Sequence, residues 1–157
     1  MARGRKTNGR IVAQNRKARR DYLIESSLEA GIELLGSEVK SLRDGRVSLN
    51  ESYAQEREGE IVLVNCYIGE YPGSGRFNHE PRRARRLLIR RREIDRLIGA
   101  VQRDGMTLVP LSIYFNERGL AKVDLALARG KRKYEKRATI KEREWKREKA
   151  RVLRDKS

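Results

Sequence analysis

The sequence predicts one α+β domain, mainly β, in which antiparallel strands form a small barrel or a sandwich. Apolar and polar residues alternate over 22–34, which is the period of a half-buried strand. Turn signals at 58–59 and 116–119 each separate two further strand patterns. The clearest helical period, 3.6 residues, falls at 94–101. Several strands with one or two helices define this class, but periodicity alone does not choose between barrel and sandwich.

The first strand pattern is followed by a short helix. The alternating apolar residues are Tyr22, Ile24, Leu28, Ala30, Ile32 and Leu34. After Gly36, residues 37–43 have the composition of a short helix, with Ser37 as the expected N-cap. Asp44 and Gly45 then provide a stop signal, so that the helix should end there.

Two hairpins are predicted downstream. Residues 52–57 and 60–67 form the first, and the apolar second arm should lie centrally in the sheet, with Cys66 as a small core residue inside it. Residues 107–115 and 120–128 form the second, which should end the globular part at Gly130.

A long loop and a helix separate the hairpins. Residues 69–81 contain several glycines and prolines and few apolar residues, which predicts a surface loop long enough to have a purpose. Ile94, Leu97, Ile98 and Val101 then follow at helical spacing, with Gly105 just beyond the end. This apolar stripe should cover the sheet.

Positive charge is concentrated at the two ends of the chain. The net charge is +16, of which residues 1–20 carry +8 and residues 130–157 carry +8, so the middle is neutral on balance. Within that middle, residues 82–96 hold eight arginines against Glu93 and Asp95, which predicts a third basic surface. Three basic clusters around a neutral core favour a polyanionic partner.

The basic ends are predicted to lie outside the domain. Residues 1–15 have too few apolar side chains to bury and should be a flexible N-terminus. Residues 131–157 are rich in helix formers but have no continuous apolar stripe, so this tail should be disordered when free and helical when bound. The expected domain therefore spans residues 16–130.

The sequence contains no recognisable catalytic or metal site. One histidine, His79, and one cysteine, Cys66, exclude a zinc site of the usual spacing, and no cofactor motif is present. His79 has Glu80 beside it but no nucleophile, and is expected at the surface, whereas Asp104 and Asp124 are isolated carboxylates. We therefore expect a protein that is not an enzyme.

No export or membrane signal is evident. Met1–Arg10 is basic but lacks the apolar stretch of a signal peptide, and no apolar run reaches the roughly 18 residues that cross a bilayer. A single cysteine also fits a reducing compartment. A cytoplasmic protein is expected.

Short motifs along nearly the whole chain resemble the SmpB family, the SsrA-binding or tmRNA-binding proteins of bacteria. They are Asn15–Tyr22, Glu29–Ile32, Gly36–Arg43, Phe77–Pro81, Leu87–Ile89, Arg91–Ile94, Gly130–Lys131, Tyr134–Arg137 and Ile140–Arg143. The resemblance implies an OB-like antiparallel barrel with one long and one short helix. It also implies binding to the tRNA-like domain of tmRNA and its delivery to stalled ribosomes for trans-translation. EF-Tu and alanyl-tRNA synthetase would be indirect partners through tmRNA, and the protein would be a monomer.

The resemblance also implies specific contact residues. The tmRNA face would include Asn15, Arg16, Lys17, Arg19, Glu29, Lys40, Arg43, Leu88 and Arg90. Glu29 cannot serve phosphates and would accept hydrogen bonds from bases. The tail would sense the empty mRNA channel beyond the decoding centre through Lys131, Lys133, Tyr134, Glu135, Lys136, Arg137, Trp145, Val152 and Leu153.

Two other functions are consistent with the basic composition of the chain. A ribosomal protein with basic extensions would also thread RNA, but it would be present in every ribosome. An RNA-cleaving enzyme is opposed by the missing acid/base pair, and His79 would be its only histidine.

Overall fold

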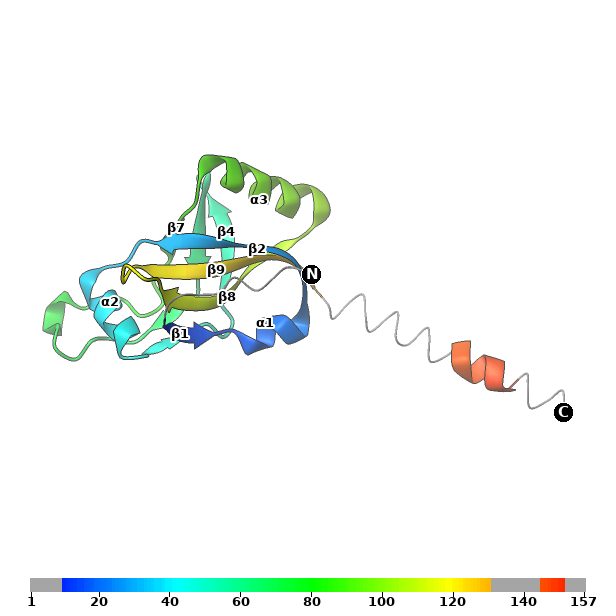
Figure 1. The fold of residues 1–157 in the computed structure, drawn as a ribbon, viewed down its shortest axis with the longest axis horizontal. Coiled ribbons are helices and arrows are strands. Elements are labelled where there is room, and N and C mark those ends of the chain that lie inside the picture. Colours follow the sequence, from blue (N-terminus) through cyan, green and yellow to red (C-terminus); the bar gives the residue numbers. More distant parts are fainter. Residues whose placement is uncertain (1–9, 131–144, 152–157) are drawn as a thin grey trace.

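The chain folds around a closed antiparallel β-barrel. In a computed structural model, which describes residues 10–130 and 145–151, the sheet closes through β8 (Thr107–Phe115), β4 (Tyr53–Arg57), β5 (Glu60–Val64), β7 (Arg85–Leu88), β2 (Tyr22–Ile32) and β9 (Ala121–Gly130). β9 also pairs with β8, and this pairing closes the ring (Figure 1). The fold prediction of an OB-like barrel is confirmed, and closure leaves few free strand edges.

Turn chemistry sets both predicted hairpins. Glu58 and Gly59 have φ of 51° and 80°, the left-handed pair that a two-residue turn between β4 and β5 requires. β5 lies between β4 and β7, so its central place is confirmed. Its end is not, because β5 stops at Val64 and the chain continues into the separate pair of β3 (Val47–Ser48) with β6 (Tyr67–Ile68). Cys66 is fully buried, but in this connection rather than inside the strand.

The long strand β2 joins two neighbours and contains a bulge. It pairs with β9 along most of its length and with β7 through Gly31 and Ile32. The register shifts between Ile24 and Ser26, which interrupts the alternation, and Ile24 is exposed although the period predicted it to be buried.

A single apolar core fills the barrel. Its fully buried side chains include Ile61, Leu63, Leu87, Ile113 and Val123, which come from β5, β7, β8 and β9. α3 (Arg91–Asp104) adds Ile94 and Leu97 to this core and ends at Gly105 with φ of 64°, as predicted. The last residue of the predicted stripe, Val101, is exposed.

The N-terminal prediction is wrong for residues 11–15. β1 (Ile11–Gln14) pairs with β8, and a short helix, α1 (Arg16–Asp21), follows immediately. Neither element was predicted, and α1 is a helix additional to the expected pair. β1 forms because β8 offers it backbone partners, with the Asn15 amide donating to Leu111 O at 2.8 Å.

The predicted short helix is present as α2 (Gly36–Arg43), but its cap differs. Leu35 is the N-cap residue, and the Glu38 carboxylate accepts a hydrogen bond from the Leu35 amide at 2.8 Å. Ser37 is the second residue of the helix, and its side chain forms a hydrogen bond with His79 instead of capping the helix. The stop signal is confirmed, since Gly45 has φ of 73°. No helix in the described part of the chain is long and apolar enough to cross a membrane.

Candidate nucleic-acid interface

One face of the barrel lies between two basic helices. The outer surface of β2, β9, β8 and β1 runs from α1 at one end to α2 at the other (Figure 1). Along each strand of this face, every second side chain points into the core, and the side chains between them point away from the barrel. Most of the described residues implied by the family resemblance lie on this face or on its flanking helices.

Helix α1 presents a row of basic side chains at one end of the face. Ala18 is buried against an outer apolar cluster, which consists of Val109, Leu111, Ala126, Ala128 and the partly buried Tyr22. With Ala18 packed against the sheet, Arg16, Lys17 and Arg19 are exposed. Lys17 also lies 3.8 Å from Glu51, but both side chains are so exposed that this ion pair holds Lys17 only weakly.

Asn15 is a buried capping residue. Its Oδ1 accepts a hydrogen bond from the Ala18 amide at 3.1 Å, and its Nδ2 donates to the Pro110 carbonyl at 3.0 Å. The side chain is 5% exposed. Both polar atoms therefore fix the start of α1 on β8, whereas the family resemblance implied that Asn15 contacts the RNA.

Glu29 lies in the middle of the face. Its neighbours Ala30 and Leu28 point to the core, so the Glu29 carboxylate points outward, and it is exposed. The Tyr114 hydroxyl donates a hydrogen bond to it from β8. Asp124 on β9 is its cross-strand partner, so the supposedly isolated Asp124 lies beside a second carboxylate.

Like charges directly opposite each other are normally unfavourable in a sheet. Glu29 and Asp124 together form a band of hydrogen-bond acceptors between the basic helices. Lys122 lies on the same face, opposite Gly31 on one side and Tyr114 on the other. Lys122 was not predicted, although its alternation with the apolar Val123 and Leu125 could have indicated that Lys122 and Asp124 point outward.

Leu88 extends the face onto β7. It pairs with Gly31, and a Cβ placed on Gly31 would lie 3.0 Å from Leu88 Cβ. Because Gly31 has no side chain, Leu88 can lie directly beside β2, and the Leu88 side chain is 49% exposed. Arg90 is exposed at the N-cap of α3, two residues further along.

Helix α2 supplies the basic residues at the other end. Lys40 and Arg43 are three residues apart and exposed, and each lies over an aromatic ring. Lys40 Nζ is 5.4 Å from the centre of the Tyr71 ring, and the Arg43 guanidinium is 6.0 Å from that of Phe115. Such contacts favour a positive charge held at the ring face.

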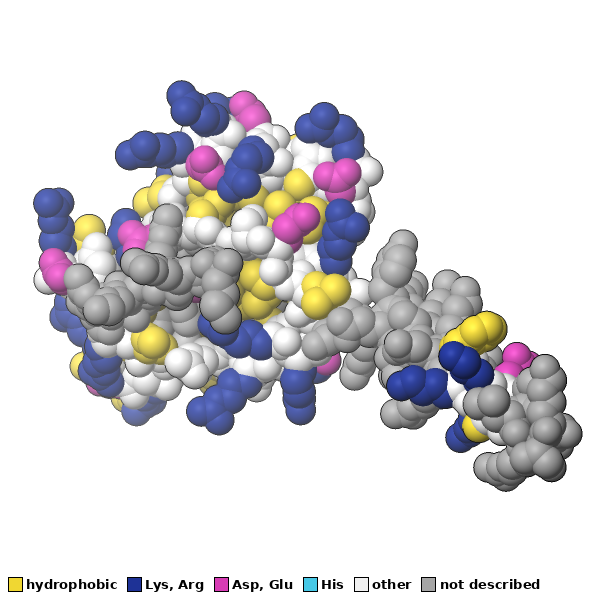
Figure 2. Space-filling view, turned by 45° about the vertical axis from the view of Figure 1, so that its right-hand side comes forward, with side chains coloured by type: hydrophobic (Ala, Val, Ile, Leu, Met, Phe, Trp, Pro, Cys, Tyr) yellow, Lys and Arg dark blue, Asp and Glu magenta, His cyan; other side chains and the backbone are white. Residues whose placement is uncertain are grey.

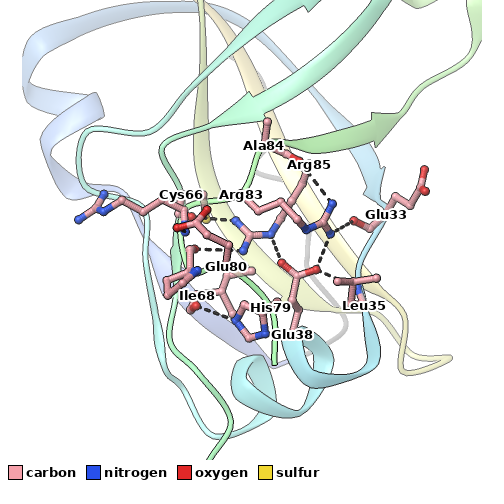
Figure 3. Close-up of polar contacts among 12 residues, drawn as sticks. Glu33, Leu35, Glu38, Cys66, Ile68, His79, Glu80, Arg83, Ala84 and Arg85 are labelled. Atoms are coloured by element: carbon pink, nitrogen blue, oxygen red, sulfur yellow. Dashed lines mark hydrogen bonds and ion pairs between the residues drawn. The ribbon is translucent and has the colours of Figure 1, made fainter. Parts of the chain in front are cut away.

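A buried ion-pair network anchors α2 to the barrel. Glu38 is fully buried, and its carboxylate accepts hydrogen bonds from Arg85 Nε and, at 2.5 Å, from Arg83 Nη2 (Figure 3). Burial alone would raise the pKa of Glu38, but the hydrogen bonds that it accepts and the charge of Arg85 hold its pKa below the ordinary value of 4.5. The carboxylate is therefore ionised inside the protein.

Arg85 uses its remaining donors on backbone carbonyls. It donates to Cys66 O at 2.8 Å and to Pro81 O at 3.1 Å, so one arginine joins α2, the β5 to β6 connection and the end of the long loop. Burial raises the pKa of the adjacent Cys66 thiol to about 11. Cys66 is thus a neutral core residue.

The predicted third basic surface is wrong in part. Arg85 is fully buried, and Arg83, Arg86 and Arg96 pair with Glu38, Glu33 and Glu93, respectively. Arg83 and Arg85 therefore pair with the buried Glu38, whereas the other six arginines of 82–96 are exposed, three of them in surface ion pairs. Figure 2 shows Lys and Arg side chains around the rim of the visible face, interspersed with acidic ones.

His79 is buried, not a surface residue. Its Nε2 lies 2.8 Å from Ile68 O, which can only accept, so Nε2 carries a proton. Its Nδ1 lies 2.8 Å from Ser37 Oγ. His79 thus ties the long loop to α2 and β6, and explains why Ser37 does not cap the helix. Among the described residues, no group of histidine, cysteine and carboxylate side chains could hold a metal ion.

Most of the predicted tail contacts lie outside the described residues. These are Lys131, Lys133, Tyr134, Glu135, Lys136, Arg137, Val152 and Leu153. Residues 145–151 are helical, and the prediction that the tail becomes helical on binding stays a prediction. Trp145 in this segment is 65% exposed.

Comparisons with known proteins agree along the chain. The profile of the family described as SmpB protein matches residues 12–155. An SsrA-binding protein of Bradyrhizobium diazoefficiens is 57% identical over 145 residues, or 92% of each chain. One from Novosphingobium aromaticivorans is 59% identical over 146 residues, covering 93% of this chain and 91% of the relative.

A solved structure matches as well. A chain of the structure reported as "tmRNA-SmpB: a journey to the center of the bacterial ribosome" superposes with a TM-score of 0.65 and 54% identity, over 78% of this chain and 86% of that one. The matched residues include the barrel strands and the two basic helices, α1 and α2, beside the outer face. The chain belongs to the SmpB family.

Proposed function

We propose that the chain binds the tRNA-like domain of tmRNA and delivers it to stalled ribosomes, where it supports peptide tagging and ribosome rescue. The named relatives are SsrA-binding proteins, and the solved relative is described with tmRNA and the bacterial ribosome. The role is one of binding in the cytoplasm, without catalysis. Contacts with EF-Tu and alanyl-tRNA synthetase are indirect, through the RNA.

The observation that carries this proposal is the acidic band between two basic helices. Arg16, Lys17 and Arg19 on α1 are exposed at one end, with Lys40 and Arg43 on α2 at the other. Basic side chains at two separated places can contact phosphates on two parts of a folded RNA. This spacing fits a structured RNA better than a single extended strand.

Glu29 adds selectivity to this surface. A carboxylate repels phosphates, so its place between basic helices favours acceptance of hydrogen bonds from base amino or imino groups. The hydrogen bond from Tyr114 holds the Glu29 side chain in place. Bases accessible in this way occur in loops and other unpaired parts of an RNA.

The remaining face residues have different roles in the proposal. Asn15 acts by positioning α1, because its polar atoms are already bonded within the protein. Leu88 offers an exposed apolar contact for a base or ribose, Arg90 adds positive charge at the edge of the face, and Lys122 adds it on β9, between β2 and β8.

The tail, residues 131–157, is assigned to the ribosome. β9 ends at Gly130 close to α1, so the tail leaves the barrel at the α1 end of the face. Its +8 charge suits the RNA walls of the empty mRNA channel, and Tyr134 has a ring that can stack on a ribosomal base.

The binding proposal predicts a steep salt dependence. If about six phosphates are neutralised, the logarithm of the affinity for a tRNA-like domain transcript should fall with log salt at a slope of about −4. Replacing Arg16, Lys17 and Arg19 with alanine should reduce this slope by about 2, because three phosphate contacts are lost. Filter binding between about 50 and 200 mM salt measures both slopes.

The matched control removes the same charge elsewhere. Arg57, Arg96 and Arg103 are exposed on β4 and α3, and their replacement with alanine should leave the slope nearly unchanged. Equal slopes for the two triple variants would show that α1 is no specific contact, and a flat response of the unmodified chain would remove the electrostatic basis of the proposal.

A further inference from the structure

The long loop at 69–81 and its surroundings carry three aromatic rings, each with a cation over it. Lys40 Nζ lies 5.4 Å from the centre of Tyr71, and the guanidinium groups of Arg76 and Arg82 lie 5.5 Å from the centres of Phe77 and Tyr67. The fourth such pair in the described part of the chain, over Phe115, involves a buried ring. We name this set, loop 69–81 with Lys40, Tyr67 and Arg82, the loop surface.

The rings of the loop surface remain accessible. Phe77 is 81% exposed and Tyr67 40% exposed. A cation lies over one face of a ring, so the opposite face is not blocked by that cation. A single exposed apolar side chain is common in soluble proteins and means little by itself. Here, however, the exposed ring belongs to a loop that the rest of the protein holds in place.

Three sets of hydrogen bonds hold the loop. The Asn78 side chain bonds both backbone groups of Tyr71, accepting from its amide at 3.0 Å and donating to its carbonyl at 2.7 Å. His79 is anchored in the interior, and the Phe77 amide donates to Ser74 O at 3.1 Å. A surface fixed before binding loses less conformational entropy on binding.

The charges around the rings identify the kind of partner. Lys40, Arg46, Arg76 and Arg82 outnumber the acidic Glu70 and Glu80. A shallow hollow beside Tyr67 is lined by Arg46, Ser48 and Pro81. Aromatic rings and arginines occur at protein interfaces too, but the excess of basic over acidic side chains here favours a polyanion, and surfaces that bind single-stranded nucleic acid combine basic side chains with exposed rings.

We propose that the loop surface is a second RNA contact, at which unpaired bases stack on Phe77 and Tyr67 while the neighbouring basic side chains contact the flanking phosphates. This contact rests on the proposed function, because it presumes that the chain binds RNA through the barrel face. Lys40 belongs to both surfaces, so the RNA would pass from α2 onto the loop. The unpaired bases belong either to tmRNA or to ribosomal RNA.

Replacing Phe77 with alanine tests the contact. The affinity of the full chain should fall between about 5-fold and 150-fold, the range that removal of one stacking ring produces. Phe77→Tyr should stay within about 2-fold, because the ring is kept. Binding is measured separately to a tRNA-like domain transcript and to 70S ribosomes, so that the arm that weakens identifies the source of the bases. Weakening in either arm supports the contact.

The control and the contradicting outcomes are distinct. Val101→Ala removes an exposed apolar side chain from α3 and should change neither affinity. Unchanged binding of Phe77→Ala in both arms would overturn the loop contact while leaving the proposed function intact, whereas failure of the unmodified chain to bind tmRNA would overturn the proposed function. Photo-crosslinking from position 77 to a ribosomal protein and not to RNA would assign the loop surface to a protein partner.

Discussion

Replacing Glu38 with glutamine is expected to lower the free energy of unfolding by about 3–5 kcal/mol, since it leaves a buried arginine without its carboxylate. Glu38 and Arg85 are both fully buried and bonded to each other. Arg85 also joins α2 to the β5 to β6 connection and to the loop end through Cys66 and Pro81. Urea unfolding followed by circular dichroism measures the loss.

Two variants make this expectation specific. Glu33→Gln breaks an exposed ion pair with Arg86 and should cost less than about 1 kcal/mol. The double variant Glu38→Gln with Arg85→Met should be less destabilised than the sum of its single changes, because neither buried charge remains. A Glu38→Gln variant as stable as Glu33→Gln would contradict the role of Glu38 as an anchor of α2.

The same pair should make stability depend on pH. Because the pKa of Glu38 lies below 4.5 in the folded chain, the unfolded chain binds this proton first as the pH falls. The contribution of Glu38 is therefore complete above about pH 4.5 and is lost as the pH falls through the folded pKa. The stability difference between the unmodified chain and Glu38→Gln should shrink in acid.

Removing residues 131–157 is expected to leave the affinity for tmRNA within a few-fold and to abolish peptide tagging. The barrel face would keep its RNA contacts, while the segment assigned to the mRNA channel would be lost. An electrophoretic mobility shift with tmRNA and a tagging reaction on a message without a stop codon measure the two effects. Loss of tmRNA binding on truncation would contradict this division between barrel and tail.

Glu29→Arg, unlike the truncation, should weaken tmRNA binding itself. Losing a hydrogen-bond acceptor for a base, together with the hydrogen bond that Glu29 accepts from the Tyr114 hydroxyl, should weaken tmRNA binding by about 5-fold to 150-fold. Glu25→Arg makes the same charge change at an exposed position in the bulge of β2 and is the matched control. If Glu29→Arg binds tmRNA as well as Glu25→Arg does, Glu29 reads no base.

The sequence predicted those elements whose signals are local. The alternation of apolar and polar residues in β2, β8 and β9, and the glycines with positive φ at positions 59 and 105, can be recognised from neighbouring residues alone. β1 and α1 were missed because their stability comes from β8, which is about 100 residues away along the chain. Only Ala18 of α1 is buried, so no amphipathic period could indicate that helix.

The number of charged residues in a segment did not predict which of them are buried as ion pairs. Arg85 and Glu38 are 47 residues apart, and their pairing depends on how α2 docks against β7. The sequence therefore placed Arg85 on a basic surface and His79 on an exposed loop, although both are buried. The site was found mainly through family motifs, whereas Lys122, a single lysine in an apolar strand, was missed.

Sequencing the RNA that co-purifies with the full chain from its native cells tests whether tmRNA is its partner. We expect tmRNA to be the most enriched RNA, with ribosomes bound substoichiometrically. A chain that carries only ribosomal RNA, in a fixed ratio to every ribosome, would contradict tmRNA binding and identify a constitutive ribosomal protein.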